Sequence, residues 1–453
     1  MHGLALVAFL LALAGLFGYI NERFLRFPHT VGLMAVGMAA SLILIVLDKT
    51  QLYPLKAIAS VLISINFETL LLHGLLAFLL FAGALHVRLD DLKRQWLPVA
   101  CFATLGVLLS AILAAILFYT VARVLGVDLP FVYALLFGAL ISPTDPVAVI
   151  GILRGAGAPR SLSTKIAGES LFNDGTGVVL FLTILGVLAA PDLNTFSLTS
   201  ASTWIYGMHA AFRLFYEILL AILLGLALGF IAYRLIKSIE SYSVEILLTL
   251  ALASGTYSLA EYLHVSAPIA VVTAGLIIGN HGRSYAMSQK TQEHLDTFWE
   301  LIDETLNALL FALMGLQIIV LTISGKMVWL SLAAIPVVIV ARFISIWLIG
   351  KPLARRWSFH PHSTILMTWA GMRGGISIAL ALAIPSSQYT TVLLTVTYGV
   401  VAFSILVQGL TFPWAMRRFM GRRKNSEGSR SIYQTSSDKS RLGSVRPIDR
   451  YTK

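Results

Sequence analysis

The chain has 453 residues, of which 57% are hydrophobic and 12% are charged, whereas about a quarter of the residues of a soluble domain are charged. Apolar runs of about 20 residues, each long enough to cross a lipid bilayer, recur along the chain until about residue 416. This composition excludes a soluble enzyme held by one or two anchors, and it predicts an all-α polytopic membrane protein.

The formal net charge of +11 lies mostly at the C-terminal end. From Arg417 onward, 11 Lys and Arg residues stand against three acidic residues. Residues 419–453 are basic and rich in Ser, as disordered tails are. We expect a cytoplasmic tail beside anionic lipid, with a regulatory protein-binding role as the alternative, and no nucleic-acid partner. Residues 1–418 form the predicted transmembrane domain.

Hydropathy predicts thirteen transmembrane helices. Their expected ranges are 2–20, 30–47, 69–87, 97–121, 130–153, 164–189, 208–233, 242–262, 266–280, 305–323, 327–350, 362–384 and 390–415. We interpret the first run as a span and not a signal peptide, because its charges follow the apolar stretch. Residues 284–304 are mixed in polarity, and we expect a separate amphipathic helix at the membrane interface there.

Basic residues divide unequally between the loops. Loops after odd-numbered spans carry 15 Lys and Arg residues and those after even-numbered spans carry five. Because basic loops stay in the cytoplasm, the N-terminus is expected outside and the C-terminus inside the plasma (inner) membrane. Arg342 and Arg373 fall within spans, where each needs a partner or a wet cavity. Cys101 is the only cysteine, so no internal disulfide forms.

Spans 5 and 12 are each interrupted near the middle. One contains SPTDP at 142–146 and the other GMRGG at 371–375, and proline and paired glycines both break helices. Interruptions seven spans apart are typical of two inverted six-helix repeats, whose broken helices cross at the substrate site of a transporter. The sequence therefore predicts two crossing broken helices.

Span 6 carries the residues with the clearest chemistry, within GESLFNDGT at 168–176. Ser170 and Asp174 are four residues apart and share a helix face. Together they present a hydroxyl and a carboxylate to one hard cation, which prefers oxygen ligands. Asp145 and the region of Thr144 complete the expected shell from span 5. The predicted site for Na⁺ is thus Asp174, Asp145, Ser170 and Thr144.

Structural roles are the alternative for several of these residues. Ser170 and Asn173 serve equally well to lock two helices together, whereas a neutral Asn would do this at Asp174 with a smaller desolvation cost. For Glu169 we favour an ion pair with Arg342 over direct contact with the transported ion.

Arg373 has two interpretations of equal weight. It offsets the negative ends of crossing half-helices and repels a second cation, or it forms a purely structural salt bridge. Three histidines within spans are expected to be packing or interfacial groups, with a proton relay or pH sensor as the alternative: His73, His86 and His264. Three glutamates near span ends are expected to be solvated or to snorkel to the interface: Glu217, Glu245 and Glu261. The Gly225 to Gly229 spacing fits close helix packing, with a subunit contact as one option.

Four segments carry a resemblance to a known family. FGALISPTDPVAVIGIL, GESLFNDGTGVVLF, ARFISIW at 341–347 and AGMRGGISIALAL at 370–382 resemble the sodium/proton exchanger family, in its Asn-Asp branch of monovalent cation:proton antiporters. The resemblance runs in order through nearly the whole membrane region. The short tail is similar to that of a bacterial-type exchanger.

The resemblance implies a thirteen-helix fold with inverted repeats, a core domain, a dimerisation domain and a homodimer. It implies that Asp174 carries the ion and the proton, that Asp145, Thr144 and Ser170 are further ligands, and that Asn173, Glu169 and Arg342 support them. Asn at position 173 implies one cation for one proton, without net charge movement. Related animal exchangers often carry an acid near Phe81, so a site residue from span 3 is doubtful here.

We therefore predict a secondary active antiporter, with no cofactor, that exchanges Na⁺, or else Li⁺ or K⁺, for H⁺. Asp174 binds a cation or a proton but never both, and the core domain moves only when the site is occupied. An intramembrane aspartyl protease is disfavoured because Asp145 is held between two prolines and Asp174 lacks a GxGD setting. A cation channel is disfavoured because a Glu169–Arg342 pair supports a closed, charge-balanced site.

Overall fold

The computed structural model describes residues 3–49, 66–145, 158–188, 201–321, 324–357 and 362–420, with a few single residues between these ranges. Every regular element in them is helical, so the predicted fold class is confirmed. The predicted tail lies outside the described residues from 421 onward, as does Pro146 in the interruption of span 5.

The helices are bounded as follows. The first half of the chain contains α1 (Gly3–Ile20), η1 (Asn21–Leu25), α2 (His29–Lys49), α4 (Phe67–Thr69), η2 (Leu70–Leu75), α5 (Leu76–Leu85), α6 (Leu89–Arg94), α7 (Trp96–Cys101), η3 (Phe102–Gly106), α8 (Val107–Val124), α9 (Phe131–Ile141) and α11 (Arg160–Leu188). The second half contains α12 (Ala201–Lys237), α13 (Tyr242–Tyr262), α14 (Ala267–Ile277), η5 (Ile278–Gly282), α15 (Arg283–Tyr285), α16 (Gln289–Leu316), η6 (Gln317–Val320), α17 (Gly325–Leu353), α18 (Ser363–Ala370), α19 (Gly375–Leu382), α20 (Thr390–Phe403), η7 (Ser404–Gln408) and α21 (Gly409–Met420).

Ten helices of the described chain are long and apolar enough to cross a membrane, and α18 with α19 makes an eleventh when the bent pair is counted as one span. The shorter α9 and α14 lie at two further predicted spans. Each of the thirteen predicted ranges overlaps one of these elements. The number of membrane crossings, thirteen, stays a prediction.

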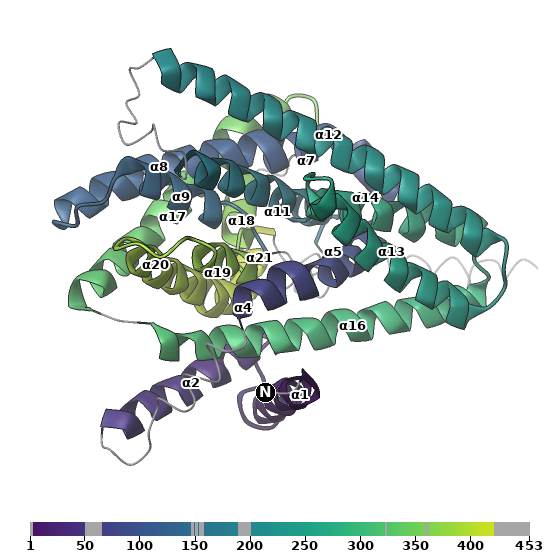
Figure 1. Ribbon diagram of the computed structural model, residues 1–453, viewed down its shortest axis with the longest axis horizontal. Helices are drawn as coiled ribbons and strands as arrows, with labels where there is room; N and C mark the ends of the chain where they lie inside the picture. Colours follow the sequence, from purple (N-terminus) through teal and green to yellow (C-terminus); the bar gives the residue numbers. More distant parts are fainter. Residues whose placement is uncertain are drawn as a thin grey trace, which may run out of the picture.

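The long helices lie side by side around a central group (Figure 1). In this view α12 runs along one side of the molecule and α16 along the other, with α5, α11 and α14 between them. The helix α16 contributes to two apolar clusters. Trp299 belongs to one together with residues of α5, α13 and α14, and Leu310 belongs to the other together with residues of α2, α9 and α19. It therefore joins two parts of the bundle.

The helix expected at 284–304 is not a separate element, and in this respect the prediction is wrong. Residues 289 to 316 form one continuous helix, α16, which Ser288 caps by accepting a hydrogen bond from Thr291 N at 3.3 Å. No Gly or Pro interrupts it before Gly315, so nothing stops the helix where polarity changes. The acidic half of the segment is thereby continuous with span 10.

Gly225 and Gly229 allow α12 to approach α14 closely, as predicted. A Cβ atom at Gly225 would lie 2.3 Å from the Ala270 carbonyl oxygen, and one at Gly229 would lie 3.2 Å from Ala274 Cα. Since this glycine face packs within the chain, the option of a subunit contact through it is wrong.

Glu245 was expected to be solvated, and this expectation is also wrong. Its side chain is buried at the start of α13, where it accepts hydrogen bonds from Ser241 N at 3.1 Å and Thr291 Oγ1 at 3.3 Å. The carboxylate satisfies a main-chain donor at the helix N-terminus, which a pattern of hydropathy does not reveal.

Candidate ion-binding site

The two interrupted spans meet directly. The helix α9 ends at Ile141 and is followed by non-helical residues through Asp145, while α18 and α19 are separated by Gly371–Gly374 and bent by 51°. Asp145 N donates a hydrogen bond to the Met372 carbonyl oxygen at 2.8 Å. The expected crossing of the broken helices is therefore present.

Charges of opposite sign face the half-helix ends at this crossing. A Cβ atom at Gly374 would lie 2.3 Å from Asp145 Oδ2, so the carboxylate sits against the positive N-terminal end of α19. Arg373 Nη1 donates to the carbonyl oxygens of Ser142 at 2.6 Å and Pro143 at 2.8 Å, just beyond the C-terminal end of α9. None of the described residues forms an ion pair with Arg373, so its geometry favours the first of its two interpretations.

Thr144, Ser170 and Asn173 form a buried polar cluster between α11 and the interruption of span 5. Asn173 Nδ2 donates to Thr144 Oγ1 at 2.7 Å, and Thr144 N donates to Asn173 Oδ1 at 3.3 Å. The Thr144 and Ser170 hydroxyl groups are hydrogen-bonded at 3.0 Å. These bonds fix the register of α11 against the unwound segment.

Glu169 and Arg342 form the expected ion pair behind this cluster. Glu169 Oε1 lies 2.5 Å from Arg342 Nη1, and the two side chains are 1% and 3% exposed. A Cβ atom at Gly371 would lie 2.8 Å from Arg342 Nε, so the guanidinium also packs against the interruption of span 12. A pair buried this deeply needs both partners, because either charge buried alone would cost folding free energy.

A cavity of about 670 Å³ opens onto the crossing. Asp145 and Asp174 both line it, and Asp174 is 5% exposed. Among the described residues that line the cavity, Thr144 and Ser170 are absent, because their hydroxyl groups are directed to each other and to Asn173. The four predicted ligands are thus divided between the cavity wall and the layer behind it.

One wall of the cavity comes from a segment to which the sequence analysis gave no site role. On α16 the lining residues follow steps of three and four positions, and they are Glu300, Asp303, Glu304, Asn307 and Leu310. Residues with this spacing share one helix face. The same spacing is visible in the sequence ELIDETLN, but it indicates a face directed to the site only when α16 is continuous with span 10.

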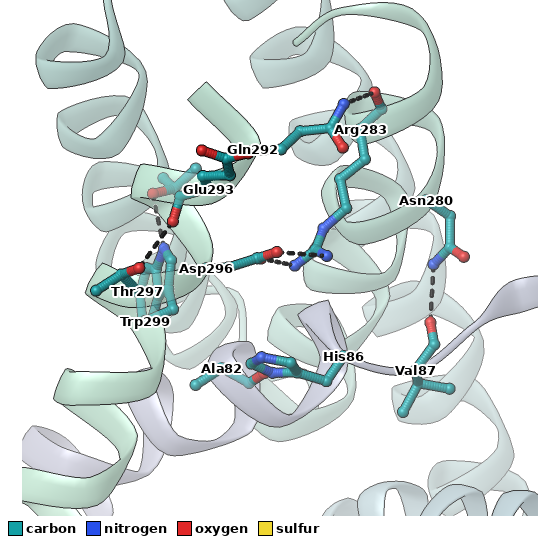
Figure 2. Close-up of polar contacts among 11 residues, drawn as sticks. Ala82, His86, Val87, Asn280, Arg283, Gln292, Glu293, Asp296, Thr297 and Trp299 are labelled. Carbon is teal, nitrogen blue, oxygen red and sulfur yellow. Dashed lines mark hydrogen bonds and ion pairs between the residues drawn. The ribbon is translucent and has the colours of Figure 1, made fainter. Parts of the chain in front are cut away.

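Polar contacts fasten the neighbouring connection to α16 (Figure 2). Arg283 of α15 forms an ion pair with Asp296, and Gln292 Nε2 donates to the Arg283 carbonyl oxygen at 2.8 Å. Asn280 Nδ2 donates to the Val87 carbonyl oxygen at 2.9 Å. These bonds hold α15 and the end of α5 in place beside the cavity.

Four of the other histidines and acids that the sequence singled out have local partners, namely His73, His86, Glu217 and Glu261. His86 lines the cavity and its Nδ1 donates to the Ala82 carbonyl oxygen at 2.8 Å. His73 Nδ1 lies 2.7 Å from Glu261 Oε1, and Glu217 accepts from Arg213 Nε at 2.7 Å. Phe81 of span 3 is buried against Trp299, with ring centroids 4.8 Å apart.

The fold and the site define a class: a multi-pass membrane protein with two broken helices that cross beside buried carboxylates, which is the architecture of secondary transporters. The sequence model of the family described as "sodium/hydrogen exchanger, transmembrane" matches residues 8–418. The chain belongs to this family.

Several known proteins are similar to the chain over most of its length. The Na⁺/H⁺ antiporter NhaP of Pseudomonas aeruginosa is 45% identical over 421 residues, which cover 92% of this chain and 96% of that relative. The Na⁺/H⁺ antiporter NhaH of Halobacillus aidingensis is 32% identical over 392 residues, covering 86% and 91%. The solved structure of the sodium proton antiporter MjNhaP1 from Methanocaldococcus jannaschii has a TM-score of 0.67 at 21% identity, with 93% and 100% covered. This last likeness concerns the fold.

Proposed function

We propose that the protein is a secondary active antiporter that exchanges Na⁺ for H⁺ across the plasma (inner) membrane. The observation that carries the proposal is the different surroundings of the buried charges. Glu169 is paired with Arg342, Arg373 faces main-chain carbonyl oxygens, and Asp145 faces the N-terminal end of α19. Asp174 lines the cavity, and none of the described residues donates a hydrogen bond to its carboxylate. It is therefore the group that takes the cation or the proton.

Competition at one carboxylate supplies the coupling. Asp174 is neutralised either by a monovalent cation or by a proton, and both occupied forms carry the same charge. Asn173 is a neutral amide engaged with Thr144, so it adds no second carboxylate. We infer electroneutral exchange, one cation for one proton. Asp145 faces the same cavity as a second ligand, and the Thr144–Ser170–Asn173 cluster positions α11 behind both.

The cavity is proposed to face the cytoplasm. Its lining includes Glu22, His86 and Glu300, which lie in or beside the loops that the distribution of basic residues assigns to the inside. This orientation has the N-terminus outside, residues 1–418 in transport and residues 419–453 as a cytoplasmic tail. We further propose a homodimer and no cofactor, with Li⁺ or K⁺ as the alternative to Na⁺ as the transported cation. The family and the relatives give no support to a protease or a channel.

Proton flux in everted vesicles tests the proposal. A pH gradient is imposed, Na⁺, Li⁺ or K⁺ is added in turn, and dissipation of the gradient is followed in the parent and in Asp174→Asn. We expect Na⁺ to dissipate the gradient in the parent, an at least 100-fold (about 2.7 kcal/mol) slower rate in Asp174→Asn, and no effect of membrane potential. Asp128→Asn, which removes an exposed acid from the connection between α8 and α9, is the control and should behave as the parent. Exchange that survives in Asp174→Asn, or a parent that no cation activates, would overturn the proposal.

A further inference from the structure

Two neutral oxygens in the cavity wall have no partner among the described residues. Asn307 Oδ1 and Ser377 Oγ are both buried, in side chains that are 3% and 1% exposed. Both residues line the cavity that reaches Asp174. A buried polar atom without a partner is destabilising, so such an atom calls for an explanation, and where it lines a cavity a bound water or ion is one.

The orientation of the Asn307 amide is fixed by its own helix. Asn307 Nδ2 donates to the Asp303 carbonyl oxygen at 2.8 Å and to Asp303 Oδ1 at 3.0 Å. Because both acceptors require the NH₂ group, the carbonyl oxygen Oδ1 is the atom left over. An oxygen that only accepts suits a cation.

The two oxygens come from helices that touch. One turn beyond Asn307, Leu310 packs against Gly375, where a Cβ atom would lie 2.6 Å from Leu310 Cδ1. Ser377 lies two residues after Gly375, in the first turn of α19. The positive end of α19 would disfavour a cation, but the Asp145 carboxylate sits against that end.

The charge along α16 favours a cation over other ligands. Glu300, Asp303 and Glu304 line the same cavity and precede Asn307 on its helix face. Their carboxylates raise the local concentration of cations. A transit position must release its ion readily, and neutral oxygens bind a cation more weakly than the carboxylates of Asp145 and Asp174.

We propose that Asn307 Oδ1 and Ser377 Oγ form a second, transient site for a partly hydrated monovalent cation, between the acidic stripe of α16 and the Asp145–Asp174 pair. The inference rests on the proposed antiport. It adds a selective binding site that the cation passes before it reaches Asp174, and it assigns the ligands of this second site to α16 and α19.

Na⁺ saturation of exchange in everted vesicles tests this site, in Asn307→Ala, Ser377→Ala and the double variant. Each single change is expected to raise the apparent KM for Na⁺ by about three- to tenfold, with the maximal rate within about twofold. The double variant is expected to be little worse than the larger single change, because one shared ion makes the two effects non-additive. Thr297→Ala is the control, since Thr297 is an exposed residue of α16 that does not appear among the described residues lining the cavity, and its hydroxyl group donates to the Glu293 carbonyl oxygen.

Three results would overturn the inference in an active parent: an unchanged KM, effects that multiply in the double variant, or a loss of maximal rate alone. If the parent itself exchanges no cation, it is the proposed antiport that has failed. A second measurement is independent of transport: crystals of Asp174→Asn soaked with Tl⁺ should show anomalous density beside Asn307 Oδ1. Density for a water only at that position would contradict the proposal.

Discussion

The two sides of the helix crossing treat buried polar groups in opposite ways. Behind the crossing, Glu169 is paired with Arg342 at 2.5 Å, and Thr144 is bonded to both Ser170 and Asn173. On the cavity side, neither the Asp174 carboxylate nor Asn307 Oδ1 accepts a hydrogen bond from the described residues. Residue type does not separate the two groups, because each side contains an acid and an Asn. What separates them is whether the fold itself supplies a partner.

This contrast divides the charges of the membrane region into a scaffold and a site. Scaffold groups pair with one another and hold two unwound segments together. Site groups are left for the ion and the proton. The division predicts that substitutions behind the crossing reduce stability first, whereas those facing the cavity reduce transport first.

The largest effect is expected from breaking the buried pair. Arg342→Gln leaves Glu169 buried without its counter-charge, which costs about 3–5 kcal/mol of stability. Thermal unfolding in detergent measures this loss, and the double variant Glu169→Gln with Arg342→Gln should recover most of it. Arg213→Gln breaks a pair whose Arg is 68% exposed and is expected to change stability little. Equal stability of the single and double variants would contradict a scaffold role.

A methyl group placed in the crossing should reduce transport strongly. In Gly374→Ala the new Cβ would lie 2.3 Å from Asp145 Oδ2, so the interrupted segments must separate. A displacement of about 1 Å at a functional group costs about 100-fold in rate, and we expect a loss of that order in exchange by reconstituted protein. Gly15→Ala, where no atom lies within 4 Å of the added Cβ, is the matched control. A Gly374→Ala protein that transports at the parental rate would show that the close approach is not needed.

The smallest effect is expected at the acidic stripe. Glu300→Gln removes one charge from the cavity wall and should raise the apparent KM for Na⁺ by about two- to threefold at low ionic strength. Because salt screens such an attraction, the difference in KM between Glu300→Gln and the parent should vanish in 0.3 M choline chloride, where the screening length is roughly a few ångströms. Glu293→Gln, an exposed acid on the same helix outside the cavity lining, should leave KM unchanged at every salt concentration. A Glu300 effect that persists at high salt would indicate direct coordination instead.

The scaffold was largely predictable from the sequence, and the cavity was not. Glu169, Arg342 and the two interruptions stand out because charges and helix breakers are rare within apolar runs. Asn307 and Ser377 do not stand out, since an Asn or a Ser in a span is most often a packing residue. Their exposure to the cavity depends on how α5, α11, α16 and α19 pack together.

One specific error and one unseen contact have the same cause. The continuity of α16 was missed because its polarity changes at Asn307 while its helical pattern does not. Thr144 and Ser170 were predicted as ligands beside Asp145 and Asp174, which stays a prediction, and the sequence did not reveal the bond between their hydroxyl groups, which joins α11 to an unwound segment. Tertiary contacts of this kind leave no periodic signal in the sequence.

The most direct test of the central claim is the pH dependence of the Na⁺ kinetics in proteoliposomes. If Asp174 binds either Na⁺ or one proton, the apparent KM for Na⁺ should rise as pH falls, by up to about tenfold per pH unit once the protonated form predominates, while the maximal rate stays unchanged. If lowering the pH changes the maximal rate alone and leaves the KM for Na⁺ constant, cation and proton do not share Asp174, and the account of coupling is wrong.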